Sequence, residues 1–177
     1  MLFREFRQRD LIRWGHTTDY LKIPYWVEGG WGVDILLGEQ TRWHEDLDVV
    51  IESRYSPVIV NYLSAGGFTL HLRDDTTPWN FRYGNDEGVE FDFHIIERDE
   101  DGNGWLGPER RYPARIMRSH GKFNARRYPC ISPGGQVRLH TGYDVDEEDW
   151  RDVSALCERF KLKIPSEYDR FRTEPAR

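Results

Sequence analysis

The sequence predicts an α+β fold, in which a twisted mixed sheet is flanked by helices. Residues 25–51 contain a β-favouring stretch, two glycines, a short helical pattern and a second β-favouring stretch, which together predict strand, turn, helix and strand. Residues 89–96 alternate polar with apolar side chains, as expected of a strand with two different faces. Residues 2–21 and 147–162 carry apolar side chains at helical spacing. Strands and helices in this succession predict a sheet with helices packed on it.

The elements can be assigned in chain order. The N-terminal helix is expected over residues 2–21, because Pro24 disfavours its continuation. After the strand that begins at Leu47, Ser56-Pro57 and Gly66-Gly67 predict the start and the end of a second helix. The other expected segments are short strands over 68–73 and 79–83, a strand over 89–96, an exposed polar loop over 98–107, a helix capped by Ser132, a helix over 147–162 and a polar, frayed tail over 166–177.

Composition limits the classes of function. The chain has 177 residues and a formal net charge of −6, which argues against a nucleic-acid-binding surface and leaves room for a cationic small molecule. The sequence shows no export signal and no apolar run long enough for a membrane span. Its two cysteines lack metal-ligand spacing and are too few for a disulfide framework. We therefore expect a cytoplasmic protein with no membrane and no nucleic-acid partner.

Two glycines, Gly29 and Gly30, separate the first strand from the helix that follows it. Without a Cβ the backbone can approach a ligand closely, and the free N–H groups at a helix start favour anions such as phosphate. The pair alone is weak evidence, because a tight turn that binds nothing uses the same residues.

Two carboxylates, Asp46 and Asp48, stand at positions i and i+2 where the second strand begins. Alternate strand residues share a face, so their Cα atoms are expected about 7 Å apart. Like charges at this separation repel and raise each other's pKa unless a cation lies between them, and Mg²⁺ is the cation that oxygen ligands of this kind suit. A solvated strand start, where aspartate is common, remains the alternative.

A third carboxylate, Asp92, lies on the polar face of the strand at 89–96 together with Glu90 and His94. If this strand pairs beside the one that carries Asp48, the three aspartates come close together. Such a trio suits metal-assisted phosphoryl or nucleotidyl transfer, in which two carboxylates hold Mg²⁺ and the third takes a proton from the attacking hydroxyl. The alternative is an edge strand with one solvated face.

Taken together, these motifs resemble the nucleotidyltransferase superfamily, which has a polymerase-β-like fold. The closest resemblance is to the short lincosamide nucleotidyltransferases, an antibiotic-modifying group, and the 2″-aminoglycoside nucleotidyltransferases are less similar. The resemblance covers about residues 20–160. The residues that carry it are Gly29-Gly30-Trp31, Asp34, Arg42-x-His44-x-Asp46-Leu47-Asp48, Asp92, Pro129-Cys130-Ile131-Ser132, Gln136 and Leu139-His140-x-Gly142-Tyr143-Asp144.

The resemblance implies a role for each matched residue. It implies Asp46 and Asp48 as Mg²⁺ ligands, and Asp92 as the general base or a third metal ligand. The implied nucleotide-binding residues are Gly29, Gly30, Trp31, Asp34, Arg42 and His44. Arg42 has a fork geometry that suits the leaving pyrophosphate. His44 either binds the nucleotide directly or is a loop histidine that orients Asp46 or faces water. The acceptor is assigned more weakly, to Glu90, His94 and Tyr143.

The implied reaction is Mg²⁺-dependent transfer of a nucleoside monophosphate from ATP or GTP to a hydroxyl of a lincosamide antibiotic, lincomycin or clindamycin, which releases pyrophosphate and inactivates the drug. Residues 1–125 would form the nucleotidyltransferase catalytic core and residues 126–177 a C-terminal helical part packed on it. A homodimer is possible. The alternatives are an aminoglycoside acceptor bound in an acidic cleft formed by Glu90, Asp86 and Glu87, an undescribed small metabolite as acceptor, or a non-catalytic, nucleotide-binding or antitoxin-like member of the fold.

Overall fold

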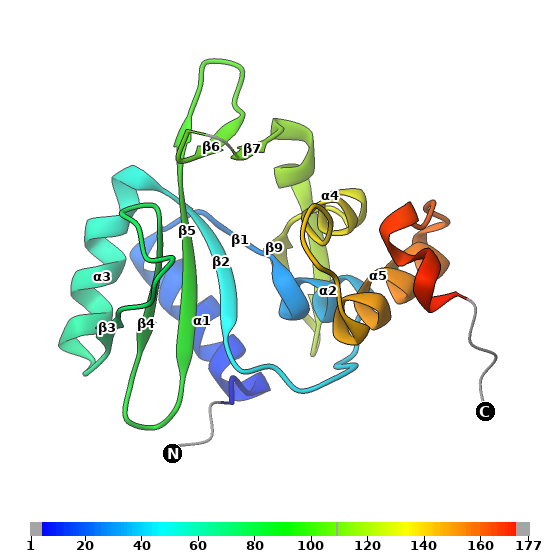
Figure 1. The fold of residues 1–177 in the computed structure, drawn as a ribbon. Helices are drawn as coiled ribbons and strands as arrows, with labels where there is room; N and C mark the ends of the chain where they lie inside the picture. The colour runs from blue at the N-terminus through cyan, green and yellow to red at the C-terminus, as the bar shows by residue number, and fades with distance from the viewer. Residues whose placement is uncertain (1–4, 109, 173–177) are drawn as a thin grey trace.

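The computed structural model describes residues 5–108 and 110–172, and it confirms the α+β class (Figure 1). The helices are α1 (Gln8–Leu21), α2 (Gly29–Leu37), α3 (Ser56–Ala65), α4 (Pro133–Leu139) and α5 (Glu147–Phe160). The strands are β1 (Tyr25–Val27), β2 (Leu47–Glu52), β3 (Thr69–His71), β4 (Asn80–Gly84), β5 (Glu90–Arg98), β6 (Gly104–Leu106), β7 (Arg110–Tyr112), β8 (Ser119–Phe123) and β9 (Arg126–Cys130). Short 3₁₀ helices cover Ser53–Tyr55, Ala114–Arg118 and Ser166–Phe171.

The described strands form one mixed sheet, as predicted. Its order is β3-β4-β5-β2-β1-β9-β8, and β6 and β7 extend it from the end of β5. The central pair, β2 and β5, is parallel and sets Asp48 opposite Asp92. Strand β4 runs antiparallel to β5 and sets Arg82 opposite the same Asp92. The middle of the sheet therefore gathers charged side chains from three adjacent strands.

Helices α1 and α3 cover one face of the sheet, and Figure 1 shows both beside β2, β4 and β5. Trp14 of α1 and Ile59 of α3 are buried in the same apolar cluster as Phe91 and Phe93 of β5. Strand residues alternate between faces, so Asp92, which lies between these two phenylalanines, is turned toward the opposite face. A second cluster joins α2, α4 and α5, which gather at the β9 end of the sheet (Figure 1).

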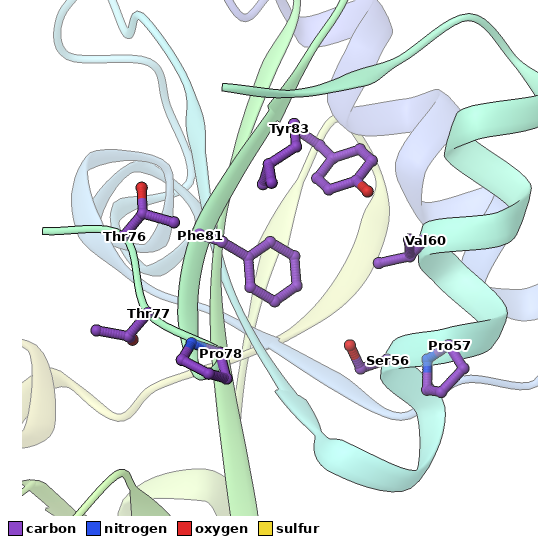
Figure 2. A pocket seen from close by; sticks show the side chains of 9 residues that line it. Ser56, Pro57, Val60, Thr76, Thr77, Pro78, Phe81 and Tyr83 are labelled. Atoms are coloured by element: carbon purple, nitrogen blue, oxygen red, sulfur yellow. The ribbon is translucent and has the colours of Figure 1, made fainter. Parts of the chain in front are cut away.

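The same alternation places Arg82. Figure 2 shows Phe81 and Tyr83 of β4 pointing toward Pro57 and Val60 of α3, where they line a pocket of about 340 Å³. Arg82 stands between them in the strand and so lies on the opposite face, with Asp92.

Several predicted segments differ from the structure. The expected loop over 98–107 contains strand β6, which pairs with both β5 and β7. Strands β8 and β9 were not predicted, and β9 begins at Arg126, the first residue of the segment expected to be helical. The expected frayed tail contains a 3₁₀ helix at Ser166–Phe171, because Tyr168 is fully buried and its hydroxyl donates to the carbonyl oxygen of His140 at 2.5 Å.

The N-terminal helix is shorter than expected. Helix α1 begins at Gln8, and Phe6 is buried although it precedes the helix. The predicted helical residues 2–4 and the tail residues 173–177 lie outside the described residues. Over the part of the chain that the structure describes, no helix is both long and apolar enough to cross a membrane.

Candidate active site

Three aspartates meet where β2 and β5 begin. Asp48 and Asp92 are opposite each other in the parallel pair, and Asp46 comes just before β2. Burial raises the pKa of Asp48 well above its usual value, and the charges of Asp46 and Asp92 raise it further. Burial also raises the pKa of Asp46 and of Asp92, although Arg82 opposes the rise in both. The three carboxylates thus repel one another in a partly dry environment, and a cation bound between them would relieve this repulsion.

An arginine that the sequence analysis did not select contacts this trio. Nε of Arg82 lies 2.8 Å from Oδ2 of Asp92, and its Nη1 lies 3.5 Å from Oδ2 of Asp46. The same Nη1 is 3.6 Å from Oε1 of Glu90. The alternation of Phe81, Arg82 and Tyr83 was a usable signal for the face on which this guanidinium lies, but its partners depend on the pairing of β4 with β5.

A buried ion pair borders the aspartates on another side. Glu28, the residue before α2, forms an ion pair with Nδ1 of His94 and accepts a hydrogen bond of 3.1 Å from the hydroxyl of Tyr112. The other imidazole nitrogen, Nε2, lies 4.0 Å from Oδ1 of Asp92. Burial alone would lower the pKa of His94, but the neighbouring Glu28 carboxylate outweighs burial and raises it to about 9. Neither Glu28 nor Tyr112 was predicted, because only the fold brings them to His94.

The glycine pair lies directly against the side chains of the site. Gly29 has φ +60, and a Cβ on it would be 2.0 Å from Oδ2 of Asp48. A Cβ on Gly30 would be 2.4 Å from Nδ1 of His44 and 2.6 Å from Nη2 of Arg42. The absence of side chains therefore lets the first turn of α2 approach Asp48, Arg42 and His44 closely.

We expect Gly29→Ala to lower the free energy of unfolding by about 1–2 kcal/mol and to reduce turnover, because the methyl group would displace the Asp48 carboxylate. Gly67→Ala is the matched control, since Gly67 also has a positive φ (+84) but a Cβ there would meet no described atom within 4 Å. Thermal unfolding and steady-state rates measure the two effects. Equal loss of turnover in both variants would contradict the role given to the close approach of Gly29.

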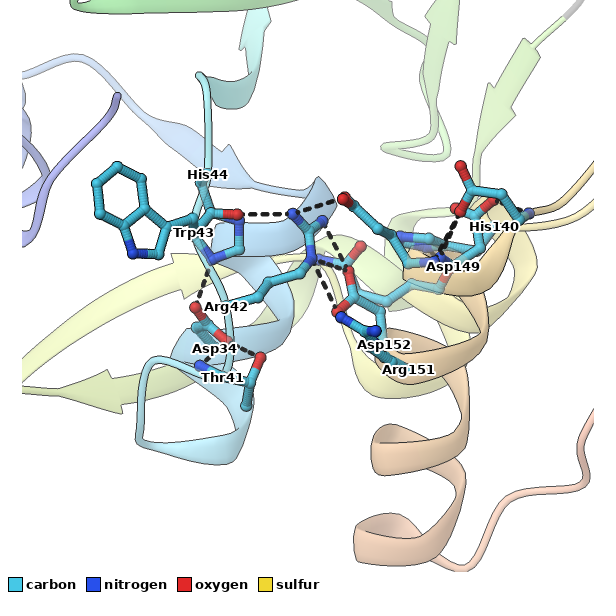
Figure 3. Close-up of polar contacts among 12 residues, drawn as sticks. Asp34, Thr41, Arg42, Trp43, His44, His140, Asp149, Arg151 and Asp152 are labelled. Atoms are coloured by element: carbon cyan, nitrogen blue, oxygen red, sulfur yellow. Dashed lines mark hydrogen bonds and ion pairs between the residues drawn. The ribbon is translucent and has the colours of Figure 1, made fainter. Parts of the chain in front are cut away.

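The loop before β2 is fixed by Asp34 of α2. Its buried carboxylate accepts hydrogen bonds from the backbone nitrogen and the hydroxyl of Thr41, at 2.9 and 2.6 Å, and is bonded to Nε2 of His44 at 2.5 Å (Figure 3). His44 is therefore held by Asp34 through one ring nitrogen, while the other faces Gly30.

Arg42 joins the same loop to α5. Its guanidinium lies 3.0 Å from Asp152 and 3.2 Å from Glu148, and Nη1 also donates to the carbonyl oxygen of Trp43 at 2.9 Å (Figure 3). Asp152 is buried. The sequence signal for this pair was therefore a charged residue among the apolar positions of the predicted helix.

The remaining candidates lie in different surroundings. The indole of Trp31 is 1% exposed and packs in the core against the rings of Phe6, His44 and Phe123. Glu90 is buried and bonded to His71 and Arg73. Tyr143 is 51% exposed, and its hydroxyl donates to Asp149 in the first turn of α5 at 2.7 Å. The structure thus gathers Asp46, Asp48, Asp92 and His94, places Glu90 next to them, and separates Trp31 as a core residue.

The donor chemistry of the trio fits a divalent metal. Carboxylate oxygens are what Mg²⁺ prefers, and the buried Oδ1 of Asp92 has no hydrogen-bond partner among the described residues. Within residues 5–108 and 110–172, however, no three His, Cys, Asp or Glu side chains already converge on a point that could hold a metal ion. In this arrangement it is Arg82 that contacts Asp46 and Asp92.

A mixed sheet with paired aspartates beside a helix that begins with two glycines is the arrangement expected of a nucleotidyltransferase, and comparison with known proteins agrees. Residues 11–156 match the model of the aminoglycoside-2″-adenylyltransferase family. The chain belongs to this family and is an enzyme of the nucleotidyltransferase class, a class whose members use a nucleoside triphosphate and typically a divalent metal. The predicted superfamily and fold are thereby confirmed.

Three similar proteins refine this assignment. A lincosamide resistance protein of Staphylococcus haemolyticus is 30% identical over 141 residues, which are 78% of this chain and 86% of that protein. The structure of the lincosamide antibiotic adenylyltransferase LnuA bound to lincomycin has a TM-score of 0.76 at 28% identity, and the match covers 86% of this chain and 97% of that one. ANT(2″)-Ia in complex with adenylyl-2″-tobramycin has a TM-score of 0.68 at 16% identity over 86% and 89% of the two chains, which shows the shared fold.

Proposed function

We propose that this enzyme transfers a nucleoside monophosphate from ATP or GTP to a hydroxyl of a lincosamide antibiotic, with Mg²⁺ as the metal and pyrophosphate as the second product. The observation that carries the chemistry is the register of β2 and β5, which sets Asp48 opposite Asp92 beside the start of α2. The choice of acceptor is supported by the similarity to the lincosamide resistance protein and to LnuA.

In the proposed step the acceptor hydroxyl oxygen bonds to the α-phosphorus, and the bond from that phosphorus to the bridging oxygen of pyrophosphate breaks. Asp92 takes the hydroxyl proton, and its raised pKa makes it a better base near neutral pH. Asp46 and Asp48 would hold Mg²⁺, which when bound neutralises charge on the phosphates. A role for Asp92 as a third metal ligand is the alternative.

The triphosphate would bind at the start of α2. Backbone N–H groups at a helix start favour anions, and the contact of Gly30 with Arg42 and His44 supports the proposal that both side chains belong to this subsite. Asp34 would act by orienting His44, and Trp31 by supporting the helix from the core.

If Asp152 positions Arg42 for the nucleotide, Asp152→Asn should raise the KM for the nucleotide about three- to tenfold with little change in kcat, because the guanidinium loses its buried anion. The free energy of unfolding is expected to fall by about 2 kcal/mol. Glu148→Gln, which removes the more exposed partner of Arg42, is the matched control and should show smaller changes. A loss of stability with an unchanged KM would mean that the pair is structural.

An aminoglycoside acceptor is the second candidate, because the matching family model bears that name. The acidic cleft that it was expected to need is less evident, since Glu90 is already bonded to His71 and Arg73. We propose His94, Glu90 and Tyr143 as residues near the acceptor. Nε2 of His94 lies 4.0 Å from Oδ1 of Asp92.

Mass spectrometry of antibiotics incubated with the protein tests the acceptor. Lincomycin, clindamycin and tobramycin are incubated separately with Mg²⁺ and the four nucleoside triphosphates. We expect a gain of one nucleoside monophosphate on the lincosamides, abolished by a chelator. A gain on tobramycin alone would favour the second candidate, and no gain on any of the three would contradict both acceptor classes.

A further inference from the structure

Arg82 already neutralises two of the three carboxylates that the metal would need. Its guanidinium contacts Oδ2 of Asp92 at 2.8 Å and Oδ2 of Asp46 at 3.5 Å. The side chain is 24% exposed, whereas that of Asp92 is 7% exposed. The arginine therefore enters from the open side of the site and ends on a buried anion.

The guanidinium and a divalent cation compete for the same two carboxylates, those of Asp46 and Asp92. A metal bound at about 2.1 Å from a carboxylate oxygen would lie within a few ångströms of the guanidinium, and two cations at that distance repel strongly. Either role proposed for Asp92, as proton acceptor or as metal ligand, also requires the lone pairs of its oxygens. The present contact of Nε with Oδ2 uses one of these oxygens.

We propose that Arg82 is a built-in counter-ion, which holds Asp46 and Asp92 while no metal is bound and leaves them when the metal and the nucleotide bind. This inference rests on the proposed function. It accounts for two geometric observations together: Arg82 contacts both Asp46 and Asp92, and within the described residues no three potential metal ligands converge on a metal position.

The released guanidinium can bind the phosphates of the nucleotide instead. The nucleotide brings several phosphate oxygens to the site with the metal, and the planar fork of arginine suits phosphate as well as carboxylate. A metal that binds alone displaces Arg82 from its carboxylates and offers the guanidinium no other anion. A metal that binds together with the nucleotide brings phosphate oxygens that the guanidinium can contact instead. Binding of the metal and of the nucleotide is therefore coupled through this side chain, and each strengthens the other.

The test is the affinity for Mn²⁺, measured by electron paramagnetic resonance on metal-free protein, with and without a nucleotide analogue that cannot be cleaved. Arg82→Gln should bind Mn²⁺ alone about tenfold more tightly than the wild type, and the analogue should improve its affinity less. Arg98→Gln is the control. Arg98 also pairs with a glutamate of the sheet, Glu52 at 3.6 Å, and its variant should bind Mn²⁺ like the wild type.

Unchanged or weaker binding of Mn²⁺ to Arg82→Gln would overturn the inference and leave the proposed function standing. If the wild type binds no Mn²⁺ even with the analogue, the proposed function and the inference fail together. Should Arg82→Gln not fold, Arg82→Lys decides instead, because one ammonium group cannot bridge two carboxylates as the fork does. Tighter Mn²⁺ binding by that variant supports the inference, and wild-type or weaker binding overturns it.

Discussion

Replacing Asp48 with asparagine is expected to lower kcat by at least about a thousandfold, equivalent to about 4 kcal/mol, while the metal-free protein stays folded and becomes more stable at pH 8. Activity falls because the variant loses a carboxylate that would hold the metal. Stability rises because the burial of Asp48 and the charges of Asp46 and Asp92 disfavour its ionised form in the folded state.

The sign of the pH dependence follows from the raised pKa of Asp48. A carboxyl group whose pKa is higher in the folded than in the unfolded state stabilises the fold below the unfolded pKa and loses this contribution as the pH rises through the folded pKa. The stability advantage of Asp48→Asn should therefore grow between pH 5 and pH 8. Thermal unfolding in the presence of a chelator measures it. Asp75→Asn, in an exposed turn, is the control and should leave both activity and stability near those of the wild type.

Replacing Glu28 with glutamine is expected to lower the free energy of unfolding of the metal-free protein by about 3 kcal/mol near pH 7, because it leaves the buried His94 cation without its anion. The pKa of His94 is raised to about 9 from 6.5. Its contribution to stability is thus fully present below pH 6.5 and is lost as the pH rises through 9. The difference between wild type and variant should shrink between pH 7 and pH 9.5.

Urea unfolding at the two pH values, with a chelator present, measures this difference. Tyr112→Phe is the matched control, because it removes the hydroxyl that donates to Glu28 and keeps the ion pair. Its cost should be about 1 kcal/mol and nearly independent of pH over this range. A cost of Glu28→Gln that is the same at both pH values would contradict the assignment of the charged pair.

Sequence reasoning selected the candidate site residues that belong to short, local sequence patterns. Asp46 and Asp48 are two residues apart where β2 begins, and Gly29-Gly30 stands between a strand and a helix, so their spacing and the family resemblance selected them. Arg82 and Glu28 were missed because their partners come from other elements. The pairing of β4 with β5 sets Arg82 against Asp92, and the end of β1 brings Glu28 to His94. No local pattern contains these pairs.

The strands were likewise predicted where a local sequence pattern marks them and missed where no such pattern does. The central strands were predicted because their Val, Ile and Phe content is typical of buried strands. Strands β8 and β9 were missed because both are short, β8 contains Gly121, and β9 begins with two arginines and contains Pro129. Their hairpin turns at Asn124 and Ala125, with φ of 46 and 62, where glycine would have given the usual signal.

The central claim is that the aspartates of β2 and β5 catalyse nucleotidyl transfer. The most direct measurement follows pyrophosphate release and the mass of lincomycin in one reaction with ATP and Mg²⁺, for the wild type and for Asp48→Asn side by side. We expect the wild type to release one pyrophosphate for each nucleotidylated drug molecule, and Asp48→Asn or added chelator to abolish both products. Transfer that continues at the wild-type rate in Asp48→Asn would contradict the claim.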